Sequence, residues 1–377
     1  MAIDGLTEVS RNPQALSARE IRNADGLSPT LQYKSELLTS ALSSPSSPAP
    51  FASTMSSSSN RLIKSVAVAG AGNLGAFFPE QLLAQGFETT VLTRAGSDKS
   101  FPAGVTVKEV DYSSALSLES ALEGIDAVIA TLTAYDAQTE LIKAAAKAGV
   151  KLFVPSEFGN VSTALKEDAH PALAGKGVAH GQLKEAGLPA VLVFTGPFPE
   201  TTFGVSCVRP SSSRPLPLVC GSLTLPTLDS YFGADFANNK MTIFGKGETP
   251  ISWTTRSDIA RFTAHHLATL TSLPTVGSPT LLRLEGSSAS FLDVVSTFKR
   301  LHPSRELEVQ HVPVEHVEHA AKDIQGGFLE SLVAYLLLTW EQGYGKSDEA
   351  GKAELSKWDE WKPQTLEEVL KELTADL

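Results

Sequence analysis

The sequence predicts an α/β protein with a Rossmann-type, doubly wound parallel sheet and a smaller C-terminal α/β part. Two observations predict this fold. From Ile63 onward, short apolar runs of strand length alternate with helix-like segments, which is the order expected when helices cover both faces of a parallel sheet. In addition, the glycine-rich segment 70–75 (GAGNLG) follows the first apolar run directly and precedes a helical stretch.

The expected elements of the sheet region can be assigned from this alternation. Six runs are predicted strands: Ser65–Ala69, Thr89–Leu92, Val105–Val110, Ala127–Thr131, Lys151–Val154 and Ala190–Phe194. Helices are expected between them over Phe77–Gln85, Leu116–Leu122, Ala137–Ala148 and Val178–Glu185. A glycine follows each of these helical stretches, where a chain commonly turns through the left-handed region: Gly86, Gly124, Gly149 and Gly187.

Later segments show a less regular rhythm. Lys240–Phe244 and Ile251–Trp253 are predicted strands, and Asp258–Leu270 is a predicted helix capped by Ser257 or Asp258. Residues 61–205, with part of 240–270, are expected to form the Rossmann domain, and 229–377 mainly the substrate-binding part. Near the C-terminus, Trp358 and Trp361 are expected to pin the tail to the domain surface.

Two segments interrupt this organisation. Residues 1–60 are predicted to be a disordered leader, because 41–60 is rich in Ser and Pro and carries no charge. Met55 offers an alternative start just before the first strand. Residues 206–228 contain four prolines and both cysteines, and we interpret them as an inserted loop. A flexible lid and a translated intron remain equal alternatives for this insertion.

The composition excludes several classes of function. The formal net charge of −11, without a basic stripe, argues against nucleic-acid binding. The longest strongly apolar stretch, Leu332–Trp340, is too short to cross a bilayer, and no secretory signal is visible. Only two cysteines are present, Cys207 and Cys220, which fits a reducing compartment. We expect a cytoplasmic protein without a membrane or nucleic-acid partner; its oligomeric state stays open.

The glycine-rich segment is the strongest motif. In a strand–turn–helix context, Gly70 permits the tight turn, Gly72 lets a pyrophosphate approach the backbone, and Gly75 allows close packing of helix and strand. The free N–H groups of the helix N-terminus then face the phosphates. Together with Asn73 and Leu74, these glycines are predicted to bind a dinucleotide.

The end of the second predicted strand indicates which dinucleotide binds. An NAD-selective site usually has an acidic side chain there, whereas this strand runs into Arg94, which can pair with a 2′-phosphate. Lys99 is expected to assist across the loop. NADP(H) is therefore the predicted cofactor. Asp111, after the third strand, is placed near the adenine, and Thr131 and Thr133, after the fourth, near the nicotinamide ribose, since ligands gather at the carboxyl ends of parallel strands.

A catalytic residue is harder to find by motif. None of the six tyrosines is followed four residues later by a lysine, so the common Tyr-x-x-x-Lys chemistry of short-chain dehydrogenases is not expected. His311, His316 and His319 cluster in the sequence, but on a strand and at a helix start. Zinc needs three or four converging ligands, so no metal site is predicted.

Several segments resemble the isoflavone-reductase-like branch of the NmrA-like family. Residues 151–159 (KLFVPSEFG) are similar to the fifth-strand signature of that branch, and 196–198, 239–247 and 258–260 also fit its pattern. Lys176 precedes Gly187-Leu188-Pro189 by eleven residues, the spacing of the family's catalytic lysine. The resemblance covers 63–270 well and the C-terminal part loosely. One departure is Gly72-Asn73, where many members have Thr-Gly.

The resemblance implies an NADPH-dependent reductase of a small aromatic or other electrophilic metabolite. Lys176 would be the acid/base residue, and burial and a neighbouring helix N-terminus would lower its pKa, although the surrounding glycines suggest a flexible context. Ser156 and Phe158 are assigned to the cofactor site, and His180, one turn beyond Lys176, could face the cleft. The alternative is a non-catalytic NADP(H)-sensing regulator of the NmrA type.

Overall fold

The computed structural model describes residues 61–163, 169–204, 219–220, 223–224, 232–325 and 327–377. The predicted leader 1–60 and most of the predicted insertion 206–228 lie outside these residues. The described part of the insertion is two short strands, β7 (Val219–Cys220) and β8 (Leu223–Thr224), which pair antiparallel. The described residues all belong to one compact unit.

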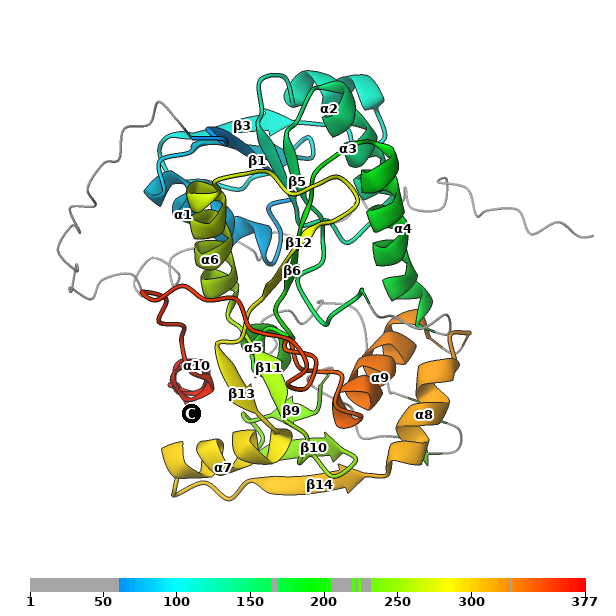
Figure 1. Ribbon diagram of the computed structural model, residues 1–377. Helices are drawn as coiled ribbons and strands as arrows, with labels where there is room; N and C mark the ends of the chain where they lie inside the picture. The colour runs from blue at the N-terminus through cyan, green and yellow to red at the C-terminus, as the bar shows by residue number, and fades with distance from the viewer. Residues whose placement is uncertain (1–60, 164–168, 205–218, 221–222, 225–231, 326) are drawn as a thin grey trace, which may run out of the picture. The chain divides into compact units, whose positions relative to one another are not determined.

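The centre of this unit is a parallel sheet, in the order β3-β2-β1-β4-β5 (Figure 1). Its strands are β1 (Ser65–Ala69), β2 (Glu88–Thr93), β3 (Val105–Glu109), β4 (Ala127–Ala130) and β5 (Leu152–Val154). A parallel bridge from Phe153 to Ala190 continues it to β6 (Val191–Phe194), which pairs parallel with β12 (Thr280–Arg283). The strand order reverses between β1 and β4, and this confirms the predicted doubly wound fold.

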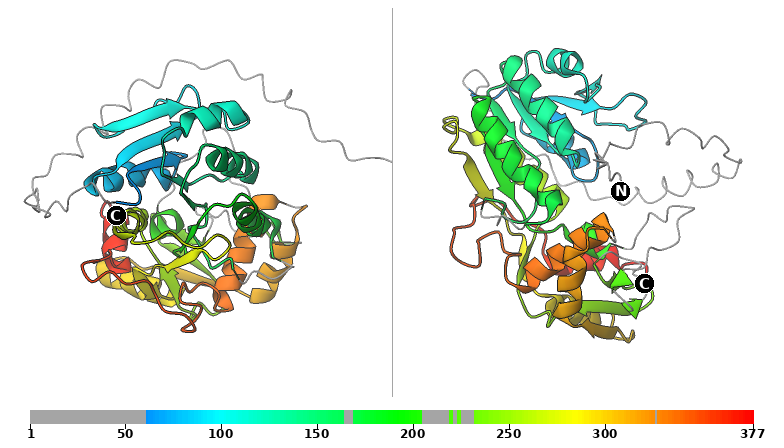
Figure 2. Two further views of the ribbon diagram at one scale, coloured as in Figure 1. Left: turned by 45° about the horizontal axis from the view of Figure 1, so that its top comes forward. Right: turned by 90° about the vertical axis from the view of Figure 1, so that its right-hand side faces the viewer.

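Helices cover both faces of the sheet because alternate residues of a buried strand point to opposite sides. On one face, Val66 and Val68 of β1 pack with α1 (Phe78–Ala84) and α6 (Arg256–Thr269). On the other face, Ala67 and Ala69 pack with α2 (Ala115–Ala121), α3 (Tyr135–Lys147) and α4 (Pro171–Glu185). Figure 2 shows α3 and α4 side by side on this second face.

The start of α4 and the capping residue of α6 differ from the prediction. Helix α4 begins at Pro171 rather than Val178, because the His170 side chain accepts a hydrogen bond from the Ala172 N–H at 3.1 Å and proline fits the first helical position. Helix α6 begins at Arg256, and its cap is Thr255, whose side chain accepts from the Asp258 N–H. By contrast, the four glycines predicted to follow helices all have positive φ, between 71° and 78°.

The C-terminal part has its own hydrophobic cluster around large aromatic side chains such as Trp253, Trp340 and Phe203. Its strands form a sheet in the order β14-β10-β9 and a pair, β11-β13: β9 (Ala234–Asp235), β10 (Lys240–Phe244), β11 (Ile251–Trp253), β13 (Ser287–Ala289) and β14 (Glu308–Val312). Its helices are α5 (Pro199–Phe203), α7 (Phe291–Leu301), α8 (Val314–Lys322), α9 (Phe328–Glu341) and α10 (Leu366–Leu373).

The C-terminal tail returns to the Rossmann part. Trp361 contacts Phe262 of α6 with ring centroids 4.8 Å apart, and Trp358 stacks on His265 at 3.7 Å. These contacts confirm that the two tryptophans pin the tail. Within the described residues, every helix is too short or too polar to span a bilayer.

Candidate active site

The glycine-rich turn joins β1 to a short 3-10 helix, Gly75–Phe77, that leads into α1. Gly70 has φ +92°, a backbone conformation that disfavours side chains. A Cβ on Gly75 would lie 1.9 Å from the Gly70 carbonyl oxygen, so only glycine fits there. A Cβ on Gly72, in contrast, would meet no atom within 4 Å. The turn is therefore tightly packed at Gly70 and Gly75 and open at Gly72.

Asn73 and Leu74 anchor the turn in different ways. Leu74 is buried in the core under α1. Asn73 is held by Arg256 of α6, which donates to both its backbone and its side-chain oxygen, and its amide donates to Thr201 of α5 at 3.2 Å. Arg256 also pairs with Glu200 at 3.5 Å. Sequence reasoning missed Arg256. Asn73, where many family members have glycine, is thus bonded to two helices that lie far away in the sequence, α6 through Arg256 and α5 through Thr201.

The structure places two predicted cations beside this turn. Arg94 is exposed and directly follows β2, whose Leu92 carbonyl accepts from the Gly70 N–H at 3.3 Å. The Lys99 ammonium donates to the Ala71 carbonyl oxygen within the turn. Both side chains can therefore offer positive charge at the edge where phosphates would lie.

The residues after β3 are more strongly engaged with the protein itself. The Asp111 carboxylate accepts from the Ser113 N–H at 2.9 Å and from its hydroxyl at 2.6 Å, and these bonds lower the pKa of Asp111. The neighbouring Tyr112 donates its hydroxyl to the Leu92 carbonyl at 3.1 Å, and burial raises its pKa to about 12. Asp111 thus serves a local turn, and its predicted contact with adenine stays a prediction.

Beyond β4 and β5, hydroxyl groups bond mainly to the backbone. Thr131 donates to the Gly70 carbonyl at 2.5 Å, and Ser156 donates to the Ala130 carbonyl at 3.0 Å while accepting from the Leu132 N–H at 2.9 Å. Thr133 is exposed. Thr131 and Ser156 therefore fix the shape of the sheet edge.

Lys176 lies inside α4, not in a flexible glycine segment as its neighbours suggested. Its ammonium donates to the backbone carbonyl of Glu157 at 2.5 Å and lies 3.6 Å from that residue's carboxylate Oε2. The Lys176 side chain is 12% exposed, and burial lowers its pKa even though Glu157 acts in the opposite direction. Because Lys176 is the sixth residue of the helix, its burial rather than the helix N-terminus causes this shift.

Glu157 is a further residue of the site to which sequence reasoning assigned no role. Its carboxylate is 1% exposed and accepts from His180 Nε2 on Oε1 at 2.7 Å and from the Ser162 hydroxyl on Oε2 at 2.6 Å. Burial alone would raise its pKa, but the hydrogen bond from His180, the charge of Lys176 and the bond from Ser162 hold that pKa below its ordinary value. The four-residue spacing of Lys176 and His180 on one helix face was the available signal.

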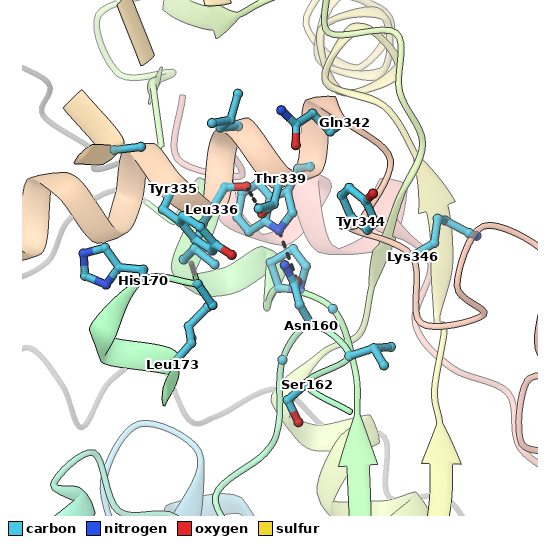
Figure 3. Close-up of a pocket in the computed structure, with 18 of the residues that line it drawn as sticks. Asn160, Ser162, His170, Leu173, Tyr335, Leu336, Thr339, Gln342, Tyr344 and Lys346 are labelled. Atoms are coloured by element: carbon cyan, nitrogen blue, oxygen red, sulfur yellow. Dashed lines mark hydrogen bonds between the residues drawn. The ribbon is translucent and has the colours of Figure 1, made fainter. Parts of the chain in front are cut away.

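A cavity of about 1030 Å³ lies beside these residues, with Lys176, Ser162 and Phe158 in its wall. Figure 3 shows that its opposite wall comes from α9 and the loop that follows, with Tyr335, Leu336, Thr339, Gln342 and Tyr344 among the side chains. The Trp340 indole donates to Asn160 Oδ1 at 3.1 Å and links the two walls. Apolar surface exceeds polar surface in this lining, and polar and charged side chains such as Lys176, Lys346 and Glu349 are interspersed with the aromatic and aliphatic ones.

The fold and the glycine turn define a Rossmann-type dinucleotide-fold protein. A model of the family described as the NmrA-like family matches residues 63–370, and the chain belongs to that family. This confirms the resemblance predicted from the sequence.

Individual relatives agree with this assignment. The chain is 29% identical over 304 residues to "Oxidoreductase aprR" of Aspergillus flavus, covering 75% of this chain and 89% of the relative. It is 31% identical over 215 residues to "Isoflavone reductase homolog IRL" of Zea mays, covering 53% and 62%. The solved structure "AtPrR2 with NADP+ and (+)pinoresinol" has a similar fold, with a TM-score of 0.61 at 22% identity over 82% of this chain and 99% of that one.

Proposed function

We propose that this chain is an NADPH-dependent oxidoreductase that reduces a small aromatic or other electrophilic metabolite, with Lys176 as its acid/base residue. Relatives named as oxidoreductases, and a solved structure of the same fold with NADP+, support the cofactor and the reaction class. The open backbone at Gly72 and the cations Arg94 and Lys99 support the binding of a phosphorylated dinucleotide.

The observation that carries the proposal is the position of the Lys176 ammonium. It lies in the wall of the cavity, nearly buried, at the end of a hydrogen-bonded chain that includes Glu157 and His180. A lysine whose pKa is lowered by burial can exchange a proton closer to neutral pH than an exposed one. Bound NADPH would supply a hydride. Lys176 would then hold the proton that balances the negative charge developing on the substrate.

The remaining side chains of the cavity have complementary parts in this proposal. Phe158, which was assigned to the cofactor site from the sequence, lines this cavity, and together with the aromatic groups of α9 it would pack against a planar substrate and exclude water from it. The Ser162 hydroxyl donates a hydrogen bond to the Glu157 carboxylate, which lies beside the Lys176 ammonium. The large, mostly apolar wall therefore favours an aromatic metabolite over a small hydrophilic one.

Replacing Lys176 with Met tests this assignment. We expect turnover of any substrate found in a panel of aromatic carbonyl and related electrophilic compounds to fall by about 10²–10⁴, the usual contribution of a general acid, while NADPH binding measured by calorimetry is retained. Lys184→Met, an exposed lysine two turns further along α4, is the matched control. Unchanged turnover in Lys176→Met would remove Lys176 from the mechanism. NADPH binding without turnover of any compound by the wild-type protein would instead favour a cofactor sensor.

A further inference from the structure

The buried Glu157 carboxylate interacts with two basic side chains of this site, Lys176 and His180. Glu157 is 1% exposed; His180 bonds to its Oε1 at 2.7 Å, whereas Lys176 lies 3.6 Å from its Oε2. The Ser162 hydroxyl, at 2.6 Å, holds the same Oε2. The two basic groups differ in access to solvent: the Lys176 side chain is 12% exposed, and that of His180 is 25% exposed.

A buried carboxylate is costly unless a cation or several hydrogen bonds compensate it. In the resting protein the hydrogen bond from His180, the charge of the Lys176 ammonium and the hydrogen bond from Ser162 provide this compensation together. Once Lys176 gives its proton to a substrate, the carboxylate loses its neighbouring cation. His180 already bonds to the other oxygen, and an imidazole takes up a proton near neutral pH more readily than any other side chain.

The other ionisable group facing Glu157 cannot take this part. Tyr135 of α3 bonds through its hydroxyl to the Ala172 carbonyl, and burial, together with the charge of Glu157, raises its pKa to about 12. It therefore stays neutral at physiological pH. Among the described residues whose charge acts on Glu157, this leaves Lys176 and His180 of α4 as the basic partners of the carboxylate.

We propose that Glu157 is the positioning residue of this site and couples Lys176 to His180 through its two carboxylate oxygens. When Lys176 loses one proton to the substrate, His180 gains one from water, and the charge of the cluster is unchanged. Lys176 then takes up a proton from water while His180 releases one to water, and the resting state is restored. The destination of the proton rests on the proposed function, whereas the coupling is a property of the protein without substrate.

The pH dependence of Lys176 acylation in the full chain tests the coupling. Acetic anhydride is reacted with the protein across a pH series, and the modified Lys176 peptide is quantified by mass spectrometry, with exposed Lys184 on the same helix as the internal control. We expect Glu157→Gln to move the Lys176 midpoint down by at least about one pH unit, because the buried ammonium loses its opposite charge. A general loosening of the site would move this midpoint up, towards that of an exposed lysine.

Replacing His180 with Phe should have the opposite effect. The carboxylate then loses one of its two side-chain hydrogen bonds and keeps the one from Ser162, so its negative charge acts more strongly on the ammonium and the Lys176 midpoint should rise. In the double variant with Glu157→Gln this rise should vanish, because His180 acts on Lys176 only through the carboxylate. A Lys176 midpoint that does not fall in Glu157→Gln, or a His180→Phe effect that persists in the double variant, would overturn the proposal.

A further variant keeps the test decisive if Glu157→Gln fails to fold, which circular dichroism and thermal unfolding would reveal. Ser162→Ala removes one hydrogen bond from Oε2 without changing any charge and should also raise the Lys176 midpoint. No shift in either Ser162→Ala or His180→Phe would contradict the coupling. Since neither substrate nor cofactor is present in the labelling, its failure is distinct from a failure to find NADPH oxidation.

Discussion

Replacing Gly75 with Ala should damage both the fold and the cofactor site. The added Cβ would lie 1.9 Å from the Gly70 carbonyl oxygen and 2.4 Å from Thr131 Oγ1, whereas ordinary contact begins at 3.4 Å. The turn and the helix would have to separate by about 1.5 Å. The two obstructing atoms are hydrogen-bonded to each other at 2.5 Å, so neither can move independently.

The cost of this overpacking is expected to be about 1–3 kcal/mol of unfolding free energy. For a chain of this size, such a loss lowers the melting temperature by about 2–10 °C. The displaced turn should also bind NADPH at least tenfold more weakly, which corresponds to about 1.4 kcal/mol. Thermal unfolding followed by circular dichroism and calorimetric titration with NADPH measure the two effects separately.

Gly72→Ala is the matched control, because the same methyl group would meet no protein atom within 4 Å. Its melting temperature should stay within about 2 °C of the wild type. NADPH affinity should nevertheless fall at least about tenfold, since the methyl group would occupy the space through which the pyrophosphate approaches the backbone. Unchanged affinity in Gly72→Ala would refute the proposed cofactor placement. Wild-type stability in Gly75→Ala would refute the steric reasoning.

Three further predictions concern charged groups of the site. Arg94→Gln should weaken NADPH binding by about 10–100-fold, which corresponds to the loss of a charge-assisted hydrogen bond. NADH binding, measured by the same calorimetry, should be unchanged. Equal losses of affinity for both cofactors would contradict a contact with the 2′-phosphate. Arg256→Met should release Asn73 and raise the NADPH dissociation constant several-fold with little effect on kcat at saturation, whereas a loss of kcat alone would speak against a role in holding the turn. Reductase turnover should decline as pH rises through the pKa of Lys176, because the lysine must be protonated to act as the acid. Burial lowers this pKa, so the decline should occur at lower pH than for an exposed lysine. A profile of rate against pH with no such decline would exclude Lys176 as the acid.

The sheet could be predicted from the sequence because its signals are local. A strand buried on both faces is a continuous apolar run, and a helix that ends in a left-handed residue favours glycine. β1 was predicted with its observed bounds, and Gly86, Gly124, Gly149 and Gly187 all have the positive φ expected of such glycines. The remaining strands of the sheet differed by one or two residues, the usual ambiguity at the ends of elements.

Helix α4 shows where local signals fail. Gly175 and Gly177 lower its intrinsic helix propensity, so its first two turns resemble a loop in sequence. Tertiary contacts decide the outcome: a Cβ on Gly175 would lie 2.3 Å from the Tyr135 ring of α3, so glycine permits the two helices to pack closely. A residue that weakens the isolated helix is thus required by its packing, and this same packing places Lys176 beside the cavity.

The two halves of the site differ in predictability for a physical reason. The proposed cofactor half centres on one continuous turn and the ends of consecutive strands, which local sequence signals predict, although Arg256 and Thr201 hold Asn73 of this turn from distant segments. The other half depends on contacts between distant segments, such as Trp340 with Asn160 and Lys176 with Glu157. Glu157 is part of the segment 151–159 that resembles the family, but no role for it could be predicted from the sequence. A carboxylate affects the pKa of a neighbouring group strongly only when both are buried and in contact, and the sequence does not show these conditions. The proposed role of Glu157 depends on the folded chain. In an exposed loop the same carboxylate would be solvated by water, so it would have little effect on the pKa of a lysine and would not require a hydrogen bond from a histidine.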